Sequence, residues 1–422
     1  MSPDLALQLP DGASMRRGFV VNCGGLPIAS TWLDKPLSGK NVHYFFVSVI
    51  STDLPGPSGL SSTKLDRLSI TSFSTYTAGL IIYRFDNLGQ SLSPCRHILL
   101  DHGAIIELKW LPSSDTNFSL LACVFSDGTA AVIKVTESFL SGPDLYSKLV
   151  SSSVQLSLDS ESLKILCCTW TSHKTLLVGT TEGCVAEFDI TNPSKPLFIL
   201  PLCVPSVLSM QSDYGTGIFG PEPVPDRSNN ILLSSGDLDV LLLDLSNPSQ
   251  LIEGAKFREP LSNIVYSALI NGFIYADGTR SLKFSTVRDS STNVKLKVYD
   301  EAPQCCSCSD YSPLVLAGCA NGSVRILNVY QHLGQPLKSS NAGSLRLYKL
   351  DVLDSDTEQY RLNLGYSVNK KEELTNEYSA YENAIGVTSC SMCNSPESHN
   401  VIGCTYGGGL IVVEVLQSVV QG

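Results

Sequence analysis

A short unit recurs seven times along this chain: an apolar run, a tight turn, and a second apolar run. In the three clearest copies the turn contains Asp-Gly, Glu-Gly or Asn-Gly, pairs that readily adopt the positive φ angles of a two-residue hairpin. These copies span residues 120–135, 176–190 and 314–329, and looser copies span 68–85, 231–245, 273–287 and 401–415. Hairpins that recur at about 40 residues or more are typical of propeller blades. The repeat therefore predicts an all-β fold, a seven-bladed WD40-like β-propeller.

The seven units fill almost the whole chain, so we expect one domain over residues 18–422 after an N-terminal tail at 1–17. The last unit, at 384–416, shows only three strands. We expect residues 18–21 to supply its fourth strand by pairing with 410–416, because such closure removes two open sheet edges. The other expected blades cover residues 26–85, 102–156, 163–200, the stretch from 204 through the hairpin at 231–245, 261–299 and 304–350.

Three insertions interrupt this pattern, at residues 51–63, 213–230 and 351–383. Propeller faces are built from the loops between strands, so these long loops are the expected partner surface. Their aromatic and large aliphatic side chains have no core to fill, and aromatic residues are enriched at binding hot spots. The alternative is that each loop folds back on its own blade. The candidate interface residues are Tyr214, Ile218, Phe219, Tyr360 and Tyr366.

The insertion at 351–383 is polar and acid-rich, and two interpretations stay open for it. A segment of this length without a clear apolar period is typical of a disordered insertion. It is also typical of an arm that becomes ordered when it docks to a partner. Within it, Tyr360, Leu362, Leu364 and Tyr366 alternate as in a β-strand, which is consistent with part of the segment pairing with a sheet edge.

The charge and cysteine content narrow the function classes. A net charge of −11 argues against strong binding of nucleic-acid phosphates, because that binding depends on clustered Lys and Arg. The 14 cysteines belong to a long chain whose start, Met1-Ser-Pro-Asp-Leu-Ala, lacks the basic and apolar regions of a secretory signal, so we expect reduced thiols. No apolar run approaches the roughly 18 residues of a membrane span. We therefore expect a protein of the cytosol or nucleus that has no membrane contact.

Motifs that resemble catalytic or ligand sites lack the context that their chemistry requires. The string Gly215-Thr-Gly-Ile-Phe-Gly220 matches a dinucleotide pattern, but the prolines from Pro221 onward prevent the helix that would hold a pyrophosphate. Two C-x-x-C spacings, at 305–308 and 390–393, fall on expected strands, where residues i and i+3 point to opposite faces. Structural cysteines are favoured there over a zinc site between the last two blades. We expect no enzymatic activity, no cofactor and no metal.

Another set of residues is expected to stabilise the blades. His102 precedes Gly103 just before a strand, a position from which propeller histidines often bond a neighbouring turn. Asp189 and Asp244 follow an apolar residue at a strand end, as weakened forms of the dipeptide that names the WD repeat. The full set is Trp32, His102, Trp110, Asp127, Gly128, Trp170, Gly183, Asp189, Asp244 and Gly322.

Two segments in the first third of the chain resemble one divergent WD-repeat family. Residues 21–33 and 44–48 are similar to its N-x-G-G-x-[VI]-W-x-x-x-W opening and its Y-L-A-[VI]-S strand. Residues 99–112, preceded by 80–85, are similar to its H-x-G-x-[VI]-W-D-L-K-W-x-P segment and its I-Q-I-[WY]-x-F strand. The family is the propeller subunit of transcription factor IIIC that is called tau91-like in yeasts and beta in animals.

The chain departs from the family pattern at Ile106 and Glu107, where the family usually has Trp and Asp. The family also has a long basic N-terminal region, of which this sequence has only Arg16 and Arg17. The resemblance implies a non-catalytic, nuclear scaffold in RNA polymerase III transcription. It also implies pairing with the second propeller subunit of transcription factor IIIC and support of the largest, B-box-binding subunit at transfer-RNA genes, with DNA contacted mainly through these partners. The competing interpretation is a generic cytoplasmic adaptor, as in trafficking coats or ribosome assembly.

Overall fold

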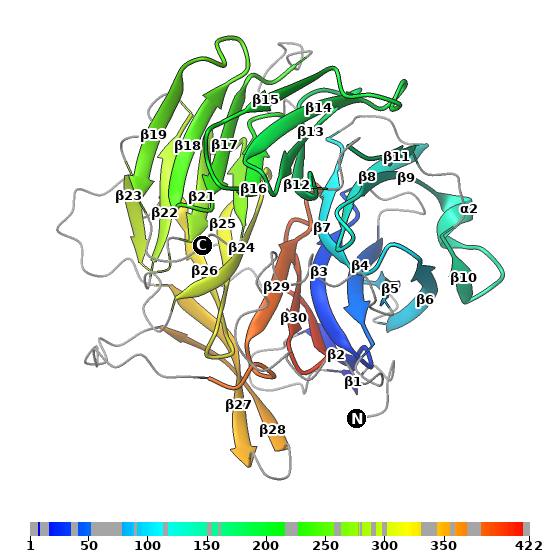
Figure 1. Ribbon diagram of the computed structural model, residues 1–422. Coiled ribbons are helices and arrows are strands. Elements are labelled where there is room, and N and C mark those ends of the chain that lie inside the picture. The colour runs from blue at the N-terminus through cyan, green and yellow to red at the C-terminus, as the bar shows by residue number, and fades with distance from the viewer. Residues whose placement is uncertain are drawn as a thin grey trace.

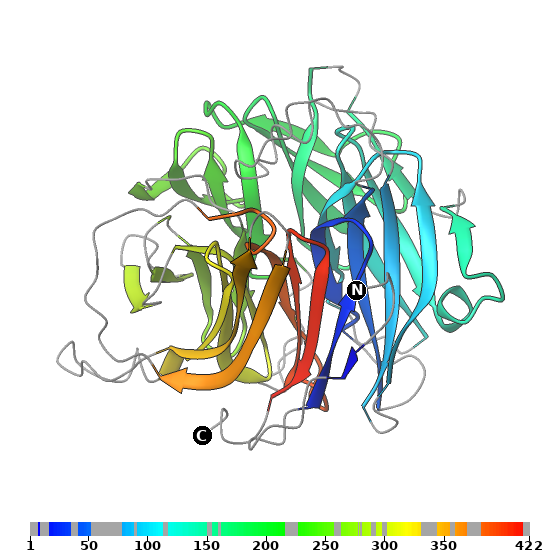
Figure 2. The same cartoon turned by 90° about the horizontal axis from the view of Figure 1, so that it is seen from below.

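A computed structural model shows seven β-sheets arranged in a ring, which confirms the seven-bladed propeller (Figures 1 and 2). In the described part of the chain, helix is limited to the short α2 (Glu137–Leu140) and to residues 329–330. The structure describes residues 7–8, 17–34, 41–51, 78–87, 91–112, 117–149, 154–158, 162–215, 227–256, 263–276, 278, 281–287, 293–297, 302–330, 344–354, 359–368 and 381–416.

Blades one to four each begin with the strand nearest the ring centre. Blade one comprises β3 (Leu26–Trp32), β4 (Val42–Ile50), β5 (Ala78–Asp86), β6 (Ser91–Leu100) and β10 (Tyr146–Lys148). Blade two comprises β7 (Ile105–Trp110), β8 (Phe118–Phe125), β9 (Ala130–Thr136) and β11 (Val154–Leu156). Blade three comprises β12 (Ile165–Trp170), β13 (Thr175–Thr180), β14 (Cys184–Asp189) and β15 (Phe198–Pro201). Blade four comprises β16 (Val207–Ser212), β17 (Asn230–Ser235), β18 (Asp239–Asp244) and β19 (Leu251–Lys256).

Blades five to seven complete the ring. Blade five comprises β20 (Ile264–Ser267), β21 (Gly272–Ala276), β22 (Ser281–Thr286) and β23 (Asn293–Lys297). Blade six comprises β24 (Pro303–Ser309), β25 (Ser312–Cys319), β26 (Ser323–Asn328), β27 (Leu345–Asp354) and β28 (Gln359–Val368). Blade seven comprises β29 (Val387–Met392), β30 (Val401–Tyr406), β31 (Leu410–Val415), β2 (Arg17–Asn22) and β1 (Leu7–Gln8).

The predicted hairpins form because glycine supplies the left-handed backbone of each tight turn. Gly128, Gly183 and Gly322 have φ angles of 89°, 66° and 80°. At Gly183 a β-carbon would also overlap the carbonyl oxygen of Val204, so both the backbone angle and the available space require glycine. These turns set the register of the central hairpins, which in turn decides which side chains face the neighbouring blade.

The hydrophobic core lies mainly between adjacent blades. Cys167, Leu177 and Val185 of blade three, for example, pack in one buried cluster with Val207 and Ile231 of blade four. Strand residues alternate between two faces, so each blade contributes one apolar set to each neighbour. A radial sheet that is buried on both faces accounts for the continuous apolar runs in the sequence.

Backbone N–H groups of the innermost strands donate hydrogen bonds to side chains of the neighbouring blade. At six junctions, a side chain of the preceding blade accepts a hydrogen bond from a backbone N–H of the next. These bonds run from Trp32 to Ser391 Oγ (3.2 Å), Ile105 to Ser48 Oγ (3.0 Å), Cys168 to Glu107 Oε2 (2.9 Å), Ser212 to Thr169 Oγ1 (3.0 Å), Cys306 to Asn263 Oδ1 (3.0 Å) and Met392 to Ser307 Oγ (2.9 Å).

A segment of blade two clasps the outer edge of blade one. After β9 the chain forms α2 and then β10, which pairs in parallel with β6 at Tyr146 to His97. Arg96 Nη2 donates to Ser147 Oγ at 3.3 Å, and the Lys148 ammonium lies 3.2 Å from Asp101. This clasp, which was not predicted from the sequence, ties the two blades together at the circumference.

The insertions differ in what the structure shows of them. Residues 52–63 lie outside the described residues, and of 213–230 only residues 213–215 and 227–230 are described. The stretch 351–383 is partly regular: its first residues complete β27, and β28 pairs with β27 from Leu345 opposite Val368 to Asp354 opposite Gln359. The expected strand-like alternation from Tyr360 onward is confirmed by β28.

The ring closes as expected, through a strand from the start of the chain. β2 pairs antiparallel with β31 over its whole length, from Arg17 opposite Val415 to Asn22 opposite Leu410. Cys23 N–H extends the pairing by donating to Gly409 O at 2.9 Å, and Val21 is fully buried. Blade seven therefore joins both ends of the described chain.

Deleting residues 1–25 should lower the melting temperature by on the order of 5 °C or more, because it opens an edge of β31 and uncovers the side chains packed beneath β2. Deleting residues 1–6 leaves β2 and its pairing intact and serves as the matched control. Thermal unfolding followed by circular dichroism measures both. Equal melting curves for the two deletions would contradict a stabilising role of this closure.

A second prediction concerns the buried carboxylate that links blades two and three. Glu107→Ala should lower the free energy of unfolding by about 1–3 kcal/mol, because it leaves the Cys168 N–H buried without its acceptor. Glu107→Gln keeps an acceptor oxygen and should cost clearly less. Urea denaturation of both variants makes the comparison, and equal losses of stability would show that the hydrogen bond is not what matters at this position.

Candidate partner-binding surface

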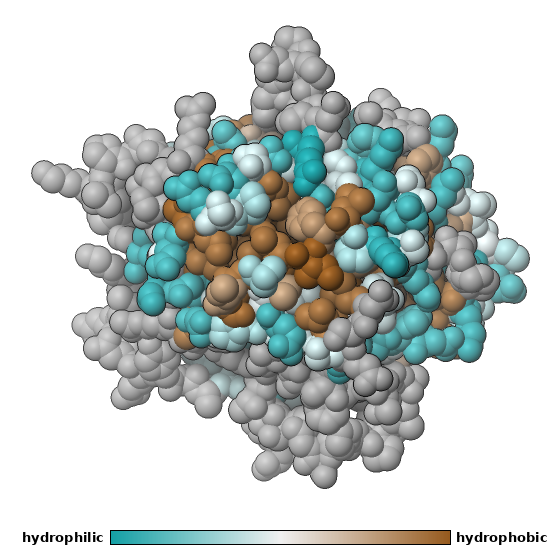
Figure 3. Space-filling view, turned by 45° about the horizontal axis from the view of Figure 1, so that its top comes forward, coloured by the Kyte–Doolittle hydropathy of each residue, from teal (hydrophilic) through white to brown (hydrophobic). Residues whose placement is uncertain are grey.

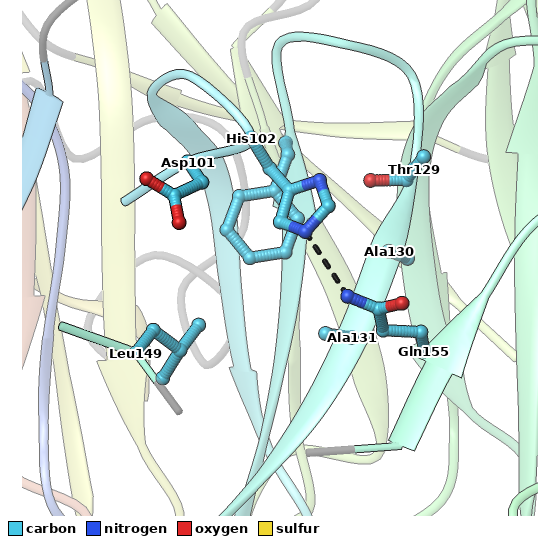
Figure 4. Close-up of a pocket in the computed structure, with 8 residues that line it drawn as sticks. Asp101, His102, Thr129, Ala130, Ala131, Leu149 and Gln155 are labelled. Atoms are coloured by element: carbon cyan, nitrogen blue, oxygen red, sulfur yellow. Dashed lines mark hydrogen bonds between the residues drawn. The ribbon is translucent and has the colours of Figure 1, made fainter. Parts of the chain in front are cut away.

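His102 joins two turns at the junction of blades one and two. Its Nδ1 lies 2.9 Å from Asp127 Oδ2. Its Nε2 lies 3.0 Å from Gln155 Nε2 (Figure 4). Asp127 Oδ1 in turn accepts hydrogen bonds from the N–H and the hydroxyl of Thr129, at 2.9 and 2.7 Å. Both ring nitrogens are therefore engaged by protein groups, which fits a structural histidine better than a proton-transfer catalyst.

A pocket of about 190 Å³ lies beside this histidine (Figure 4). Phe125, Ala130, Ala131 and Leu149 supply its apolar lining. Asp101, at its rim, is exposed and paired with Lys148. The arrangement offers a small recess that is lined by polar and apolar side chains alike, next to an exposed ion pair. It brings together no nucleophile, base and oxyanion donor of the kind that a hydrolase site requires.

The remaining blade residues occupy structural positions. Trp32 is fully buried with its ring centroid 4.6 Å from that of Phe45, and Trp170 Nε1 donates to Lys109 O at 3.1 Å. Trp110 is also buried and meets Phe46 edge to face, at 5.1 Å between centroids.

The two aspartates at strand ends each hold the turn that follows. Asp189 Oδ1 accepts from the hydroxyl and N–H of Thr191, at 2.6 and 2.8 Å, and these hydrogen bonds hold the pKa of the Asp189 carboxyl below its ordinary value. Asp244 makes the same pair of bonds with Ser246. Such turns fix the path of the chain from the third strand of a blade toward the fourth.

The two C-x-x-C segments lie on β24 and at the end of β29. Cys305 belongs to the cluster between blades six and seven, whereas Cys306 packs in the cluster of blades five and six. Burial raises the pKa of the Cys306 thiol and raises that of Cys393 to about 12, so neither is a ready nucleophile. Among the described residues, no group of three or more His, Cys, Asp or Glu side chains could hold a metal ion.

The five predicted interface residues have different outcomes. Tyr214 is only 8% exposed and packs with the core of blades two and three, so the expectation of an exposed loop aromatic is wrong there. Ile218 and Phe219 lie outside the described residues. Tyr360 is on β28 and is 37% exposed, and the backbone of Tyr366 belongs to the same strand. Of the two predicted interface residues whose side chains the structure describes, Tyr360 lies at the surface and Tyr214 does not.

Tyr360 belongs to a hairpin that projects from the ring, here called the blade-six arm and comprising β27 and β28 (Figure 1). β26 pairs with β27 only as far as Ser323 opposite Lys349, so the part of the hairpin beyond Leu350 extends past it. Near its tip, Leu353 is 60% exposed, and the preceding residue, Val352, lies opposite Tyr360 in the register. Leu353 was not among the predicted interface residues, because Asp351 and Asp354 make this part of the sequence resemble a polar loop.

The base of the arm is fixed to the body. Leu362 and Leu364 pack, partly buried, against the core of blades six and seven, as does Val352. The Lys349 ammonium lies 2.7 Å from Asp351 Oδ1 across this part of β27. The arm thus combines a packed base with two exposed apolar side chains at its end, the arrangement expected of a preformed docking element.

Smaller apolar sites lie elsewhere on the rim. Leu99, Leu145 and Tyr146 are exposed at the clasped edge of blade one, and Leu197 and Ile199 at the outer edge of blade three. On the face drawn in Figure 3, hydrophobic side chains gather near the middle of the described surface and hydrophilic ones lie around them. No helix in the described part of the chain is long and apolar enough to cross a membrane.

The comparison with known proteins extends the resemblance found in the first third of the sequence. No family model matches the chain. It is 25% identical over 363 residues to the transcription factor tau 91 kDa subunit of Saccharomyces cerevisiae (strain ATCC 204508 / S288c), a match that covers 84% of this chain and 51% of that protein. The chain thus spans about half the length of the curated relative it matches. With the match running through most of the ring and seven blades in the structure, the chain is a tau91-like WD-repeat propeller.

Proposed function

We propose that this chain is a non-catalytic scaffold subunit of transcription factor IIIC. In this proposal it pairs with a second propeller subunit, supports the largest, B-box-binding subunit, and acts in the nucleus at transfer-RNA genes transcribed by RNA polymerase III. The observation that carries the proposal is the similarity to the tau 91 kDa subunit over 84% of the chain. The interblade packing and the engaged His102 are consistent with a rigid body that acts by surface complementarity.

The blade-six arm is the surface that we assign to the second propeller subunit. Its exposed Leu353 and Tyr360 stand on a base packed into the body, so little conformational entropy is lost when a partner covers them. A permanent complex buries about 2,000 Å² or more, which a projecting hairpin and the adjacent rim can supply together. Aromatic residues are enriched among binding hot spots, so Tyr360 is the first residue to test.

DNA contact is assigned mainly to the partners. The chain has a net charge of −11 and no run of Lys or Arg longer than two residues. Affinity for the phosphate backbone depends on the number of phosphates that cationic side chains neutralise. A body of this charge contributes to promoter binding by holding other subunits in place.

When this chain is co-expressed with the second propeller subunit of transcription factor IIIC, the two should elute together from a size-exclusion column in a one-to-one ratio. Replacing Leu353 and Tyr360 together with Asp should raise the dissociation constant at least about tenfold, because two exposed apolar anchors become charged. Ile252→Asp changes an exposed apolar residue on β19 of blade four and is the matched control. Separate elution of the wild-type subunits would contradict the partner, and an unaffected double variant would contradict the arm.

The isolated chain should bind a duplex that contains a B-box with a dissociation constant on the order of 10⁻⁴ M or weaker at physiological salt. Fluorescence anisotropy with a labelled duplex and with a scrambled duplex of equal length measures affinity and specificity together. Sub-micromolar, sequence-dependent binding by the purified chain would contradict the assignment of DNA contact to the partners.

A further inference from the structure

Apolar side chains from blades two and three reach the outer edge of the ring together. Ile199 of β15 lies opposite Ala186, which belongs to the core cluster between these two blades. Residues directly opposite each other share a face of the sheet, so Ile199 points toward blade two. Val154 of β11 lies, partly buried, at the margin of the same cluster. Because β15 and β11 are the outermost strands of their sheets and Ile199 is 48% exposed, this core continues to the surface.

Two further apolar residues of blade three extend this surface. Leu197 comes two residues before Ile199 and is 59% exposed. Ile190 follows β14 directly and packs, partly buried, against the cluster of blades two and three. Single exposed apolar residues are common on protein surfaces, whereas neighbouring ones that continue a core are typical of interaction sites. The surface formed by Val154, Ile190, Leu197 and Ile199 is here called the blade two–three rim.

Lys134 places a positive charge on the blade-two side of this rim. It lies opposite Leu120, which packs at the margin of the same cluster, so the Lys134 side chain leaves β9 on the side of blade three. Its ammonium lies 4.5 Å from the centroid of the Phe118 ring. This cation–π contact holds the charge beside the apolar residues.

Two lysines of blade three add to this charge. Lys195 is exposed two residues before Leu197, and Lys174 is exposed where its carbonyl oxygen accepts the N–H of Ile190 at 2.9 Å. None of the three ammonium groups forms an ion pair with a carboxylate of the described residues. Asp189, next to Ile190, already accepts two hydrogen bonds within its own turn. On a chain with a net charge of −11, a group of unpaired lysines around apolar side chains is a local exception.

We propose that the blade two–three rim binds an acidic segment of another protein, in which large apolar residues lie between Asp and Glu. The apolar residues of the segment should cover Leu197 and Ile199, and its carboxylates should pair with the surrounding lysines. Single-stranded nucleic acid fits less well, because its bases stack on exposed aromatic rings and the exposed apolar side chains here are aliphatic. This inference is independent of the proposed function, since it involves neither the blade-six arm nor the second propeller subunit.

A displayed library of random peptides tests the rim with the complete chain as the immobilised target. Selection on the wild-type chain is run with an excess of the soluble double variant Leu197→Asp, Ile199→Asp, which removes peptides that bind elsewhere. The selected peptides should contain more Asp and Glu than the starting library, with Leu, Ile or Phe between them. If no peptide is enriched, or if the enriched peptides lack acidic residues, the inference is wrong.

Fluorescence anisotropy of the most enriched peptide then tests the contribution of charge. The double variant Lys134→Glu, Lys195→Glu should weaken binding at least about tenfold, because attraction becomes repulsion. Lys295→Glu reverses the charge of an exposed lysine on β23 of blade five and is the matched control. Thermal unfolding of each variant checks that it is folded.

Two results of this measurement would overturn the inference. The first is equal affinity of the peptide for the lysine double variant and for the control. The second is displacement of the peptide by a single-stranded oligonucleotide at a lower concentration than by unlabelled peptide, which would assign the rim to nucleic acid. Either result leaves the proposed function standing, because the complex with the second propeller subunit is measured separately.

Discussion

The ring depends on hydrogen bonds that cross from one blade to the next at the innermost strands. Each of these strands pairs on one side only, and its other edge faces a confined interior. An unpaired backbone amide buried there costs about 1–3 kcal/mol, so the arrangement is stable only if another group accepts the hydrogen bond. Ser391, Ser48, Glu107, Thr169, Asn263 and Ser307 perform this role at six junctions.

A repeated irregularity accompanies these bonds. The pairing of the first and second strands shifts register near the start of the first strand in every blade except blade five, for example between Ile105 and Glu107 and between Ile165 and Cys167. A bulge adds one residue to a strand and increases its twist. In the six blades that have this shift, the first strand therefore twists more strongly near its start than a regular strand would.

Much of this fold could be predicted from the sequence because its signals are local. The turns at Gly128, Gly183 and Gly322 identify the central hairpins, and the missing strand of blade seven implies closure by the start of the chain. The parallel pairing of β10 with β6 leaves no such signal, because it joins residues about 50 positions apart and depends on the path of the whole connection. Tertiary packing determines non-local contacts of this kind, and the residues that form the turns carry no information about them.

The candidate surface was harder to predict for a related reason. Long loops are usually exposed, and this predicted an exposed Tyr214. Tyr214 is instead buried, because two residues after the end of β16 it packs in the core of blades two and three. Tyr360 could be predicted, because it alternates with Leu362 and Leu364 at the period of two that is typical of a single strand. Leu353 could not be predicted in this way. It is exposed because β26 pairs with β27 only as far as Lys349, and the end of that pairing is not encoded in the residues around Leu353.

The reactive side chains in the interior of the ring have structural roles, so the binding surface is expected at the rim. Burial raises the pKa of thiols such as Cys306 and Cys393, and the ring nitrogens of His102 are both engaged, so these groups serve the fold. A closed ring also has no strand edge at its seam to exchange with another chain, because β2 covers β31. What a closed ring can still offer a partner is its loops and its outermost strands. Six of those strands have at most 6 residues, and β28 has 10. The longest outermost strand of the described ring therefore also carries an exposed aromatic residue, Tyr360.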